Sequence, residues 1–395
     1  MNKLIRIVLK SGKDQSIRRY HPWVFSGAIK KIYGSPAEGD TVQLYDNKDE
    51  LLAIGHYQAG TIAVRILEFG RSELQEDFFE TRIGEAWKLR SELGLTSGSH
   101  TNVFRWVCAE GDGLPGLIVD YYHGAAVIQM HSVGMYRNLK AIKDAITKVA
   151  GERVDTIYNK SDGTLPEKPG IGKRSEFLLD NREENIVVEN GYKFMVNWVD
   201  GQKTGFYIDQ RENRRMAGAW SNGRRVLNMF GYTGGFSVYA MGGGAELVHS
   251  VDSSAQAIAL TNKNIELNFP GDVRHTAFET DAFRYMANMD TPYNLIILDP
   301  PAFAKHHNVL GNALQGYKRL NQKAFEKILP GGILFTFSCS QVVSRENFRK
   351  SIFAAAANAG RKVRILYQLT QPADHPVSIF HPEGEYLKGL VLEVQ

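Results

Sequence analysis

The chain has 395 residues, of which 43% are apolar and 23% are charged, and its formal net charge is +4. This composition is typical of a folded globular protein and excludes a largely disordered chain. The length allows two or three domains, and no apolar run of about 18 residues predicts a transmembrane helix. The only two cysteines, Cys108 and Cys339, are far apart. They argue against a disulfide framework and favour a reducing compartment, so we expect a cytoplasmic protein with no membrane partner.

Residues 1–75 predict an all-β domain. The short alternating runs IRIVLK, TVQLYD, LLAIGHY and TIAVRILEF are separated by Gly, Pro, Asn and Asp turns, which is typical of a small β-barrel. Within residues 1–35, eight Lys and Arg residues stand against one acid, Asp14, a local charge of +7. Such a cluster either meets phosphates or forms an ordinary solvated strand face. Charge alone leaves both interpretations open.

Residues 76–185 predict an α+β segment. The stretch EDFFETRIGEAWKLRSELGL has apolar residues at helical spacing and reaches Gly94, so we expect a helix that ends there. Strand candidates FRWVCAE, LPGLIVDYY and AAVIQMH follow, and then a second helix candidate, YRNLKAIKDAITKVAG. The segment SDGTLPEKPGIGK, at 161–173, is rich in Gly, Pro and Lys and predicts a loop or a long hairpin tip.

From about residue 186 to 395, apolar runs of strand length alternate with helix-compatible stretches. The runs are RVLNMF, ELVHSVD, NLIILD and GGILFTFS, and one intervening stretch is SSAQAIALTNKNIELN. This alternation predicts a parallel sheet with helices on both faces. Ligands in such sheets bind beyond the carboxyl ends of the strands.

The first of these strands runs into a glycine turn, VLNMFGYTGGFSVYA. Gly231, Gly234 and Gly235 allow the backbone to pass close to a ligand at the start of the next helix. The spacing G-x-x-G-G differs from the G-x-G-x-x-G that accommodates a pyrophosphate. A tight strand-to-helix turn that binds no ligand is the alternative interpretation.

Two carboxylates strengthen the ligand interpretation of this turn. Asp252 ends the strand ELVHSVD and is placed to accept hydrogen bonds from ribose hydroxyls. Asp281, in ETDAF, follows another expected strand end, where it can meet an adenine amino group. The three glycines and two acids predict an adenosine-containing ligand. The missing pyrophosphate turn favours S-adenosylmethionine over NAD.

The stretch NLIILDPPAF places Asp299 at the end of a buried strand, and Pro300 and Pro301 force the chain into an extended turn. The carboxylate is therefore expected at the rim of the sheet. Asp-Pro-Pro in this position is typical of enzymes that hold the amidine edge of a base. An aspartate that only caps a loop is the alternative.

Cys339 ends the strand that follows the Asp299 strand, so both side chains should face one crevice. There the thiolate would attack C6 of a pyrimidine and make C5 nucleophilic, while Asp299 would hydrogen-bond N3 and the exocyclic amine of a cytosine. A small buried hydrophobe is the alternative for Cys339, and it is the interpretation we favour for Cys108, in FRWVCAEG. No Cys/His cluster has metal-ligand spacing, so we predict no metal.

Together these motifs resemble the RlmI-type 23S rRNA (cytosine-C5) methyltransferases, class I methyltransferases with an N-terminal PUA domain. The matching stretches run in order over nearly the whole chain: RRYHPWVFSGAI, AEGDGLPGLIVDYY, GQKTGFYIDQRENRR, VLNMFGYTGGFSVYA, LDPPAFAK, FTFSCS and ADHPVSIFHPEGEYLKGL. The resemblance implies a PUA-like domain at 1–75, an α+β middle domain at 76–185 and a Rossmann-like class I methyltransferase domain at 186–395. It also implies that the cysteine of SCS, Cys339, is the nucleophile.

Carried over residue by residue, the resemblance implies a site for S-adenosylmethionine. We expect its residues to be Asp209, Gln210, Arg211, Phe230, Gly231, Tyr232, Thr233, Gly234, Gly235, Asp252, Asp281, Ala282 and Asp299. We expect RNA contacts from Lys10, Lys13, Arg18, Arg19, His21, Arg214 and Arg215. For Arg211, Arg214 and Arg215, a solvated helix face remains the alternative.

Two other functions compete with cytosine-C5 methylation of 23S rRNA or of a large-subunit assembly intermediate. A base-amino methyltransferase also uses Asp-Pro-Pro, but with an aromatic residue directly after it, whereas here Ala302 precedes Phe303. A non-catalytic RNA-binding or ribosome-assembly factor would need none of the chemistry at Asp299 and Cys339. The sequence does not decide between a monomer and a homodimer.

Overall fold

The computed structural model describes residues 5–98, 100–166, 171–304 and 309–395. Contacts within the chain divide it into two compact units. The first unit comprises Met1–Val187, Val196–Phe206 and Ala373–Gly384, and the second comprises Val188–Met195, Tyr207–Pro372 and Glu385–Gln395. The domain limits at 75/76 and 185/186 stay a prediction, because the units group segments that are far apart in the sequence.

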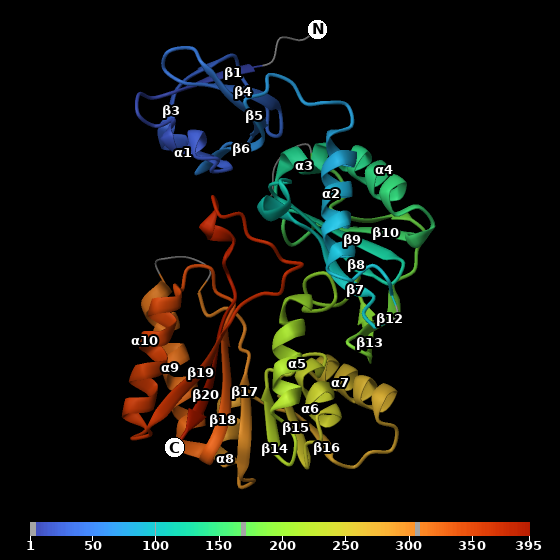
Figure 1. Ribbon diagram of the computed structural model, residues 1–395, viewed down its shortest axis with the longest axis vertical. Coiled ribbons are helices and arrows are strands. Elements are labelled where there is room, and N and C mark those ends of the chain that lie inside the picture. Colours follow the sequence, from blue (N-terminus) through green and yellow to red (C-terminus); the bar gives the residue numbers. More distant parts are fainter. Residues whose placement is uncertain (1–4, 99, 167–170, 305–308) are drawn as a thin grey trace. The chain divides into compact units, whose positions relative to one another are not determined.

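The first unit begins with a six-stranded sheet in the order β2-β6-β5-β4-β1-β3. Its elements are β1 (Ile5–Leu9), α1 (Gln15–Arg18), β2 (Trp23–Phe25), η1 (Ser26–Ala28), β3 (Ile29–Tyr33), β4 (Thr41–Tyr45), β5 (Leu51–Tyr57) and β6 (Ile62–Phe69). The sheet curls into a half-barrel whose edge strands, β2 and β3, each pair with only one neighbour (Figure 1). Alternate residues, such as Val42 and Leu44 of β4, fill its core.

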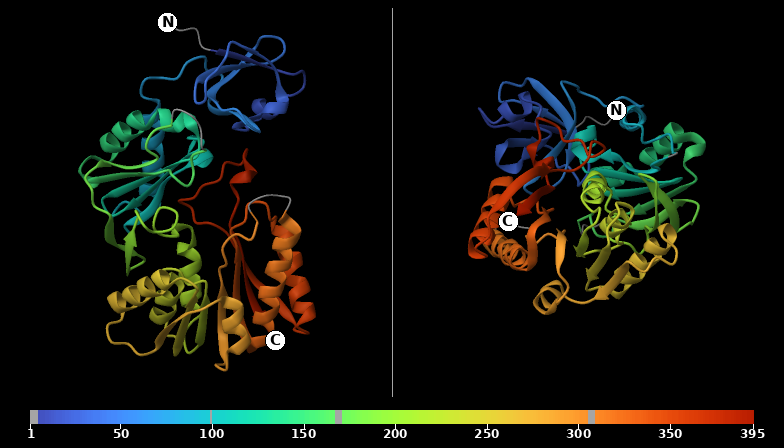
Figure 2. Two further views of the ribbon diagram at one scale, coloured as in Figure 1. Left: turned by 180° about the vertical axis from the view of Figure 1, so that it is seen from behind. Right: turned by 60° about the horizontal axis from the view of Figure 1, so that its bottom comes forward.

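The α+β segment of the first unit carries a five-stranded sheet in the order β11-β10-β9-β8-β7. Its elements are α2 (Phe78–Glu92), β7 (Val103–Cys108), η2 (Ala109–Asp112), β8 (Leu117–Tyr122), β9 (Ala125–Met130), α3 (Val133–Arg137), α4 (Leu139–Ala150), η3 (Gly151–Arg153), β10 (Thr156–Lys160) and β11 (Ser175–Leu179). Helices α2 and α4 pack together beside the sheet (Figure 2). Strands β10 and β11 pair antiparallel, so a hairpin flanks the predicted loop 161–173, of which 167–170 lie outside the described residues.

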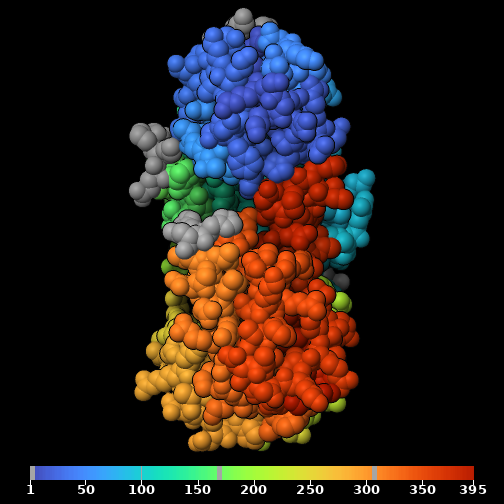
Figure 3. All heavy atoms as spheres, turned by 90° about the vertical axis from the view of Figure 1, so that its left-hand side faces the viewer, coloured from blue at the N-terminus to red at the C-terminus, as the bar shows by residue number. Residues whose placement is uncertain are grey.

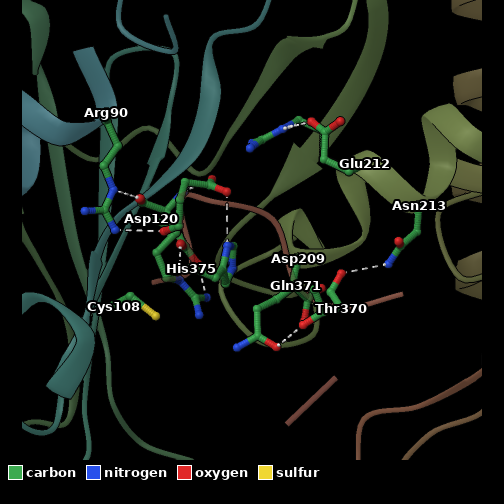
Figure 4. A network of polar contacts seen from close by, with 12 residues as sticks. Arg90, Cys108, Asp120, Asp209, Glu212, Asn213, Thr370, Gln371 and His375 are labelled. Carbon is green, nitrogen blue, oxygen red and sulfur yellow. Dashed lines mark hydrogen bonds and ion pairs between the residues drawn. The ribbon is translucent and has the colours of Figure 1, made fainter. Parts of the chain in front are cut away.

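A C-terminal segment, Ala373–Gly384, belongs to the first unit and contains η6 (Pro382–Gly384). Its Phe380 ring lies 5.4 Å from the Tyr20 ring, and its His381 ring lies 4.3 Å from the Trp23 ring. Figure 3 shows this segment, in red, directly against the N-terminal strands, in blue. Arg90, fully buried and visible in Figure 4, adds a hydrogen bond of 2.7 Å to the backbone oxygen of Asp374. The long-range contacts explain why this segment groups with the first unit.

A two-stranded hairpin, β12 (Glu184–Glu189) and β13 (Tyr192–Asn197), precedes the seven-stranded sheet of the second unit, and its central part, Val188–Met195, belongs to this unit. The other elements of this unit are η4 (Ile208–Gln210), α5 (Arg211–Ala219), β14 (Arg225–Met229), α6 (Gly235–Gly242), β15 (Leu247–Asp252), α7 (Ala255–Asn268), β16 (His275–Glu279), α8 (Ala282–Asn288), β17 (Tyr293–Leu298), α9 (Leu310–Lys327), β18 (Ile328–Ser338), α10 (Arg345–Asn358), β19 (Val363–Leu369) and β20 (Lys388–Val394). The strand order is β16-β15-β14-β17-β18-β20-β19.

The predicted parallel sheet is present from β14 to β18. Strand β20 departs from it, because it lies antiparallel between β18 and β19. Helices α6 and α7 pack on one face, and α8 and α9 pack on the other, with α10 against α9 (Figure 1). No described helix is long and apolar enough to cross a membrane. The carboxyl ends of β14, β15, β17 and β18 therefore meet along one edge, where ligands of such sheets bind.

Candidate active site

The glycine turn follows β14 and has an unusual backbone. Phe230 and Tyr232 adopt positive φ angles of 60° and 45°, and Gly234 has a φ of 74°. Non-glycine residues rarely adopt this region, and such strain is concentrated at functional sites. The turn ends at α6, whose N-terminal peptide groups are oriented to bind an anionic group.

The three glycines of the turn differ in how closely other protein atoms approach them. A Cβ atom at Gly234 would lie 2.7 Å from Thr261 Cγ2, and one at Gly235 would lie 2.9 Å from Arg214 Cδ. A Cβ atom at Gly231 would meet no protein atom closer than 3.4 Å. The packing of the chain therefore requires glycine at 234 and 235 but not at 231. A Cβ atom at Gly231 would make ordinary contacts with Asn228, Ser250 and Val251, so the cofactor contact expected at Gly231 stays a prediction.

Asp252 and Asp281 lie where the sequence placed them, after β15 and β16. The Asp252 carboxylate accepts hydrogen bonds of 3.0 Å from the backbone N–H groups of Tyr232 and Ser254. Asp281 caps α8 by accepting from the backbone N–H of Arg284 at 3.0 Å, and Ala282, the first residue of that helix, is buried. Each carboxylate oxygen has more than one lone pair. Both side chains can therefore still accept hydrogen bonds from a nucleoside.

The segment FYIDQR forms η4 and the start of α5. The Tyr386 hydroxyl donates to Asp209 Oδ2 at 2.7 Å, whereas the buried Asp209 Oδ1 has no hydrogen-bond partner among the described residues. A buried acceptor without a partner is costly. The ammonium group of S-adenosylmethionine is a donor that would satisfy it, so the residues present fit this group.

Gln210 connects this segment to the Asp-Pro-Pro turn. Its Nε2 donates to Asp299 Oδ2 at 3.1 Å, and its Oε1 accepts from Asn213 Nδ2 at 2.6 Å. Asn213 also points its amide at the backbone oxygen of Thr370, 3.4 Å away (Figure 4). Gln210 is therefore held between two partners. Its amide orients the Asp299 carboxyl group.

Asp299 directly follows β17, and protein atoms surround most of its side chain. The pKa of Asp299 is raised to about 7, mainly by this burial and also by the negative charge of Asp209. The hydrogen bond from Gln210 and the positive charge of Arg214 lower it and offset part of this rise. A carboxyl group with this pKa exists in both protonation states near neutral pH. Asp299 can therefore act either as a proton donor or as an acceptor towards a base.

Cys339 directly follows β18, the parallel neighbour of β17. Its half-buried Sγ lies 4.0 Å from the backbone oxygen of Pro300, next to Asp299. Burial is the largest cause that raises the pKa of Tyr207 above its ordinary value. Negative charge on four neighbouring groups raises it further, and these groups are Tyr232, Cys339, Asp299 and Asp209. The glycine turn, the Asp-Pro-Pro turn and the cysteine therefore gather around one tyrosine.

The two cysteines have different surroundings. Burial is the main cause that raises the pKa of Cys108 to about 12. Its thiol is therefore neutral at physiological pH and a poor nucleophile, which supports the packing interpretation. Cys339 instead stands at a strand end beside polar and ionisable groups.

The three arginines of α5 have different surroundings. Arg214 is buried, and its guanidinium donates to Glu189 Oε1 and Oε2 at 2.8 and 2.7 Å. Arg211 is also buried, so a solvated helix face is wrong for both residues. Only Arg215 is exposed, with 70% of its side chain accessible. The expectation of an RNA phosphate contact therefore remains for Arg215, whereas Arg214 has its charge matched inside the protein.

Most of the predicted basic cluster is exposed on the first unit. Lys10, Lys13 and Arg19 are exposed, and His21 is half-buried. Arg18 is exposed as well, but it pairs with three acids, Asp14, Asp46 and Glu50, at 2.6–2.9 Å. Two of these acids, Asp46 and Glu50, lie outside residues 1–35. The net positive charge around Arg18 is therefore smaller than the charge count over residues 1–35 suggests.

Two polar residues near the site were missed by the sequence analysis. Glu189 ends β12 and receives the ion pair from Arg214. Lys388 begins β20, is 4% exposed, and donates to the backbone oxygen of Ser340 at 2.6 Å. In the sequence, Lys388 lies in the stretch EYLKGL, and this stretch does not by itself indicate a functional lysine.

Comparison with known proteins agrees with this geometry. Residues 113–377 match the family model of the S-adenosylmethionine-dependent methyltransferases, and residues 7–69 match that of a PUA-like domain. The glycine turn, the strand-end acids and the sheet order define the class as a methyltransferase of the class I fold.

Curated relatives specify the family further. Ribosomal RNA large subunit methyltransferase I of Aeromonas salmonicida is 38% identical over 98% of this chain and 99% of its own length, and that of Pseudoalteromonas atlantica is 39% identical with the same coverage. The chain belongs to this family, the ribosomal RNA large subunit methyltransferase I group of the S-adenosylmethionine-dependent methyltransferases.

Solved structures share the fold at lower identity. A protein of Streptococcus mutans assigned to the S-adenosylmethionine-dependent methyltransferases is 22% identical, covers 99% of this chain and all of its own, and superposes with a TM-score of 0.84. A second methyltransferase structure, a complex with S-adenosylhomocysteine, has the same identity and coverage and a TM-score of 0.85. The fold of the described chain is therefore shared with these two structures over nearly its whole length.

Proposed function

We propose that this protein methylates C5 of a cytosine in the large-subunit ribosomal RNA, the 23S rRNA, through a covalent adduct at Cys339. The relatives named above act on ribosomal RNA of the large subunit, as their names state. The observation that carries the C5 chemistry is the proximity of Cys339 Sγ to the Asp-Pro-Pro turn, 4.0 Å from Pro300 O. The two free cysteines agree with a reducing compartment, so we place the activity in the cytoplasm.

The chemistry assigns a separate task to each side chain. The sulfur of Cys339 donates an electron pair to C6 of the base, a C–S bond forms, and the π electrons of the C5=C6 bond move to C5. Asp299, in its protonated form, donates to N3, and its other oxygen accepts from the exocyclic amine. S-adenosylmethionine supplies the methyl group that C5 takes up. Loss of the C5 proton to a base then restores the double bond and releases Cys339.

The base must leave its stack before the sulfur can reach C6 from one face. Enzymes that modify a base therefore act on flipped or single-stranded nucleotides. A PUA-like domain with exposed cations, among them Lys13 and Arg19, suits the backbone of such an RNA. We expect either free ribosomal RNA or an assembling subunit as the partner.

The competing base-amino methyltransferase is less well supported. Such an enzyme would need an aromatic ring to stack on the base beside the Asp-Pro-Pro turn. Here Phe303 is half-buried, and its ring lies 4.7 Å from that of the buried Tyr317. That chemistry would also leave Cys339 without a task. A non-catalytic factor would need neither Asp299 nor Cys339.

The test is methyl transfer from labelled S-adenosylmethionine to unmodified ribosomal RNA, followed by nucleoside mass spectrometry, with the wild type and Cys339→Ala. We expect 5-methylcytidine from the wild type and none from the variant. RNA that contains 5-fluorocytidine should trap the wild type covalently. A base cannot remove fluorine from C5 as it removes the proton, so Cys339 is not released. An active Cys339→Ala protein, or an N-methylated base as product, would contradict the proposal.

A further inference from the structure

Lys388 lies on the strand beside the cysteine. In the antiparallel pairing of β18 with β20, Lys388 is the direct partner of Ser338, the residue before Cys339. Its Nζ donates to the backbone oxygen of Ser340, the residue after Cys339, at 2.6 Å. The ammonium group therefore passes alongside Cys339 and is held there by a hydrogen bond.

This lysine is a buried cation without a carboxylate partner. Only 4% of Lys388 is exposed, and no carboxylate of the described residues lies within salt-bridge distance of its Nζ. Glu385, three positions earlier, is paired with Arg345, whose Nε lies 3.2 Å from Glu385 Oε2. A buried ammonium matched only by a neutral carbonyl is costly, and proteins rarely retain one without a counter-charge.

The charges that face Lys388 identify that counter-charge. The pKa of Lys388 is lowered to about 8, mainly by burial. A negative charge at Cys339 acts in the opposite direction and raises this pKa. The charge of Arg345 lowers the pKa, and the charge of Glu385 raises it. Because Arg345 and Glu385 are paired with each other, their effects oppose one another. Of the described groups whose charge acts on Lys388, the sulfur of Cys339 is the one left to match the ammonium.

Among the described residues, three other ionisable side chains act on or lie near Cys339, and none of these three is a cation. Tyr207, Tyr317 and Asp299 face it from η4, α9 and the turn after β17. Burial keeps both tyrosines neutral, since it raises the pKa of Tyr317 to about 12 and that of Tyr207 as well. Asp299 is neutral or negative and disfavours a second negative charge. A cation beside the sulfur is therefore needed if a thiolate is to form at neutral pH.

We propose that Lys388 is a positioning residue whose buried ammonium holds Cys339 as the thiolate that attacks the base. The inference rests on the proposed function for its role in catalysis, although the proposed ion pair itself would not need RNA. The proton of the thiol passes to water before the base binds, and no other bond changes. After the methyl transfer, the same ammonium stabilises Cys339 as the leaving thiolate.

The first test measures the thiolate directly, without RNA or methyl transfer. In a Cys108→Ser background, which leaves Cys339 as the single thiol, the rate of alkylation by iodoacetamide is followed against pH. We expect Lys388→Met to slow alkylation at about pH 7 by about tenfold or more, and to shift the profile to higher pH. Lys388→Arg keeps the charge and should restore most of the rate. Cys108→Ser with Cys339→Ala reports any labelling elsewhere.

Matched controls separate this role from a structural one. Lys350→Met removes an exposed lysine of α10 that pairs with Glu346, and it should leave the profile unchanged. Affinity for S-adenosylhomocysteine, measured by calorimetry, should stay within about twofold in Lys388→Met, which shows that the second unit is folded. An unchanged alkylation profile in Lys388→Met would overturn the inference.

The second test connects the ion pair to methyl transfer. Single-turnover methylation by Lys388→Met should be slow at about pH 7 and recover towards the wild-type rate at higher pH, where the thiol ionises unaided. If Cys339→Ala is inactive but Lys388→Met shows no such recovery, the inference about Lys388 is wrong and the proposed function stands. If Cys339→Ala remains active, the proposed function fails, whatever the alkylation profile shows.

Discussion

Arg214 and Glu189 form a buried ion pair with two hydrogen bonds, although 25 positions separate them in the sequence. Arg214 lies on α5, which precedes the sheet, and Glu189 ends β12 of the hairpin. The Tyr239 hydroxyl adds a bond of 3.0 Å to Glu189, from α6. Three elements around the glycine turn are therefore joined at one carboxylate, and a Cβ at Gly235 would press on the Arg214 side chain.

Breaking this pair should destabilise the protein strongly. Arg214→Met leaves the carboxylate of Glu189 buried without its cation, and we expect a loss of about 3–5 kcal/mol in the free energy of unfolding. Arg215→Ala, one position along, removes an exposed arginine that pairs with Glu212. It should cost less than about 1 kcal/mol. Urea unfolding of both variants gives the comparison. Equal losses would show that the buried pair contributes no more than the exposed one.

Asp299 should make stability depend on pH in a defined direction. Its folded-state pKa, about 7, is raised above the unfolded value. Below about pH 4 both states hold the proton, so the full stability is present; as the pH rises to about 7, only the unfolded state ionises and stability falls. Asp299→Asn removes this effect. It should therefore stabilise the apo protein by about 4 kcal/mol at about pH 8 and by only about 1 kcal/mol at about pH 4.5.

Urea unfolding of wild type and Asp299→Asn at the two pH values tests this prediction. The same variant should lose methyl transfer, because an amide cannot give a proton to N3. Glu279→Gln, the variant of an exposed carboxylate at the end of β16, is a matched control and should show little pH-dependent difference. A gain in Asp299→Asn that is the same at both pH values would contradict the raised pKa.

The glycine turn offers a pair of contrasting substitutions. Gly234→Ala forces a side chain into the left-handed region and against Thr261, so it should cost about 1–3 kcal/mol of stability. Gly231→Ala has room within the protein and should unfold almost like the wild type. If the cofactor contacts the Gly231 backbone as expected, this variant should bind S-adenosylhomocysteine at least about tenfold more weakly. Calorimetric titration measures this affinity. An affinity equal to that of the wild type would show that the ligand does not contact Gly231.

Salt dependence should distinguish the cations of the first unit. Lys13→Ala and Arg19→Ala should each reduce the slope of log K against log salt for RNA binding by about 1, if each residue neutralises one phosphate. Arg18→Ala should change the slope less, because its guanidinium is already matched by Asp14, Asp46 and Glu50. Filter binding over a series of salt concentrations gives these slopes. A larger effect for Arg18 than for Lys13 would contradict this assignment.

The sequence by itself determined the features that depend on local pattern. Alternation of apolar residues located the strands, and the residues that end them, Asp252, Asp299 and Cys339, could be placed at one edge because parallel strands share a direction. The glycine turn was visible for the same reason, since its chemistry is contained in a few consecutive residues.

Only the tertiary structure decided which charges are matched and by what. It buried Arg211 and Arg214, brought Asp46 and Glu50 to Arg18, and inserted β20 antiparallel so that Lys388 lies beside Cys339. It also grouped Ala373–Gly384 with the first unit. These outcomes depend on contacts between residues far apart in the sequence. The free energy of a charge depends on its burial and its neighbours, and neither is encoded in the residues next to it.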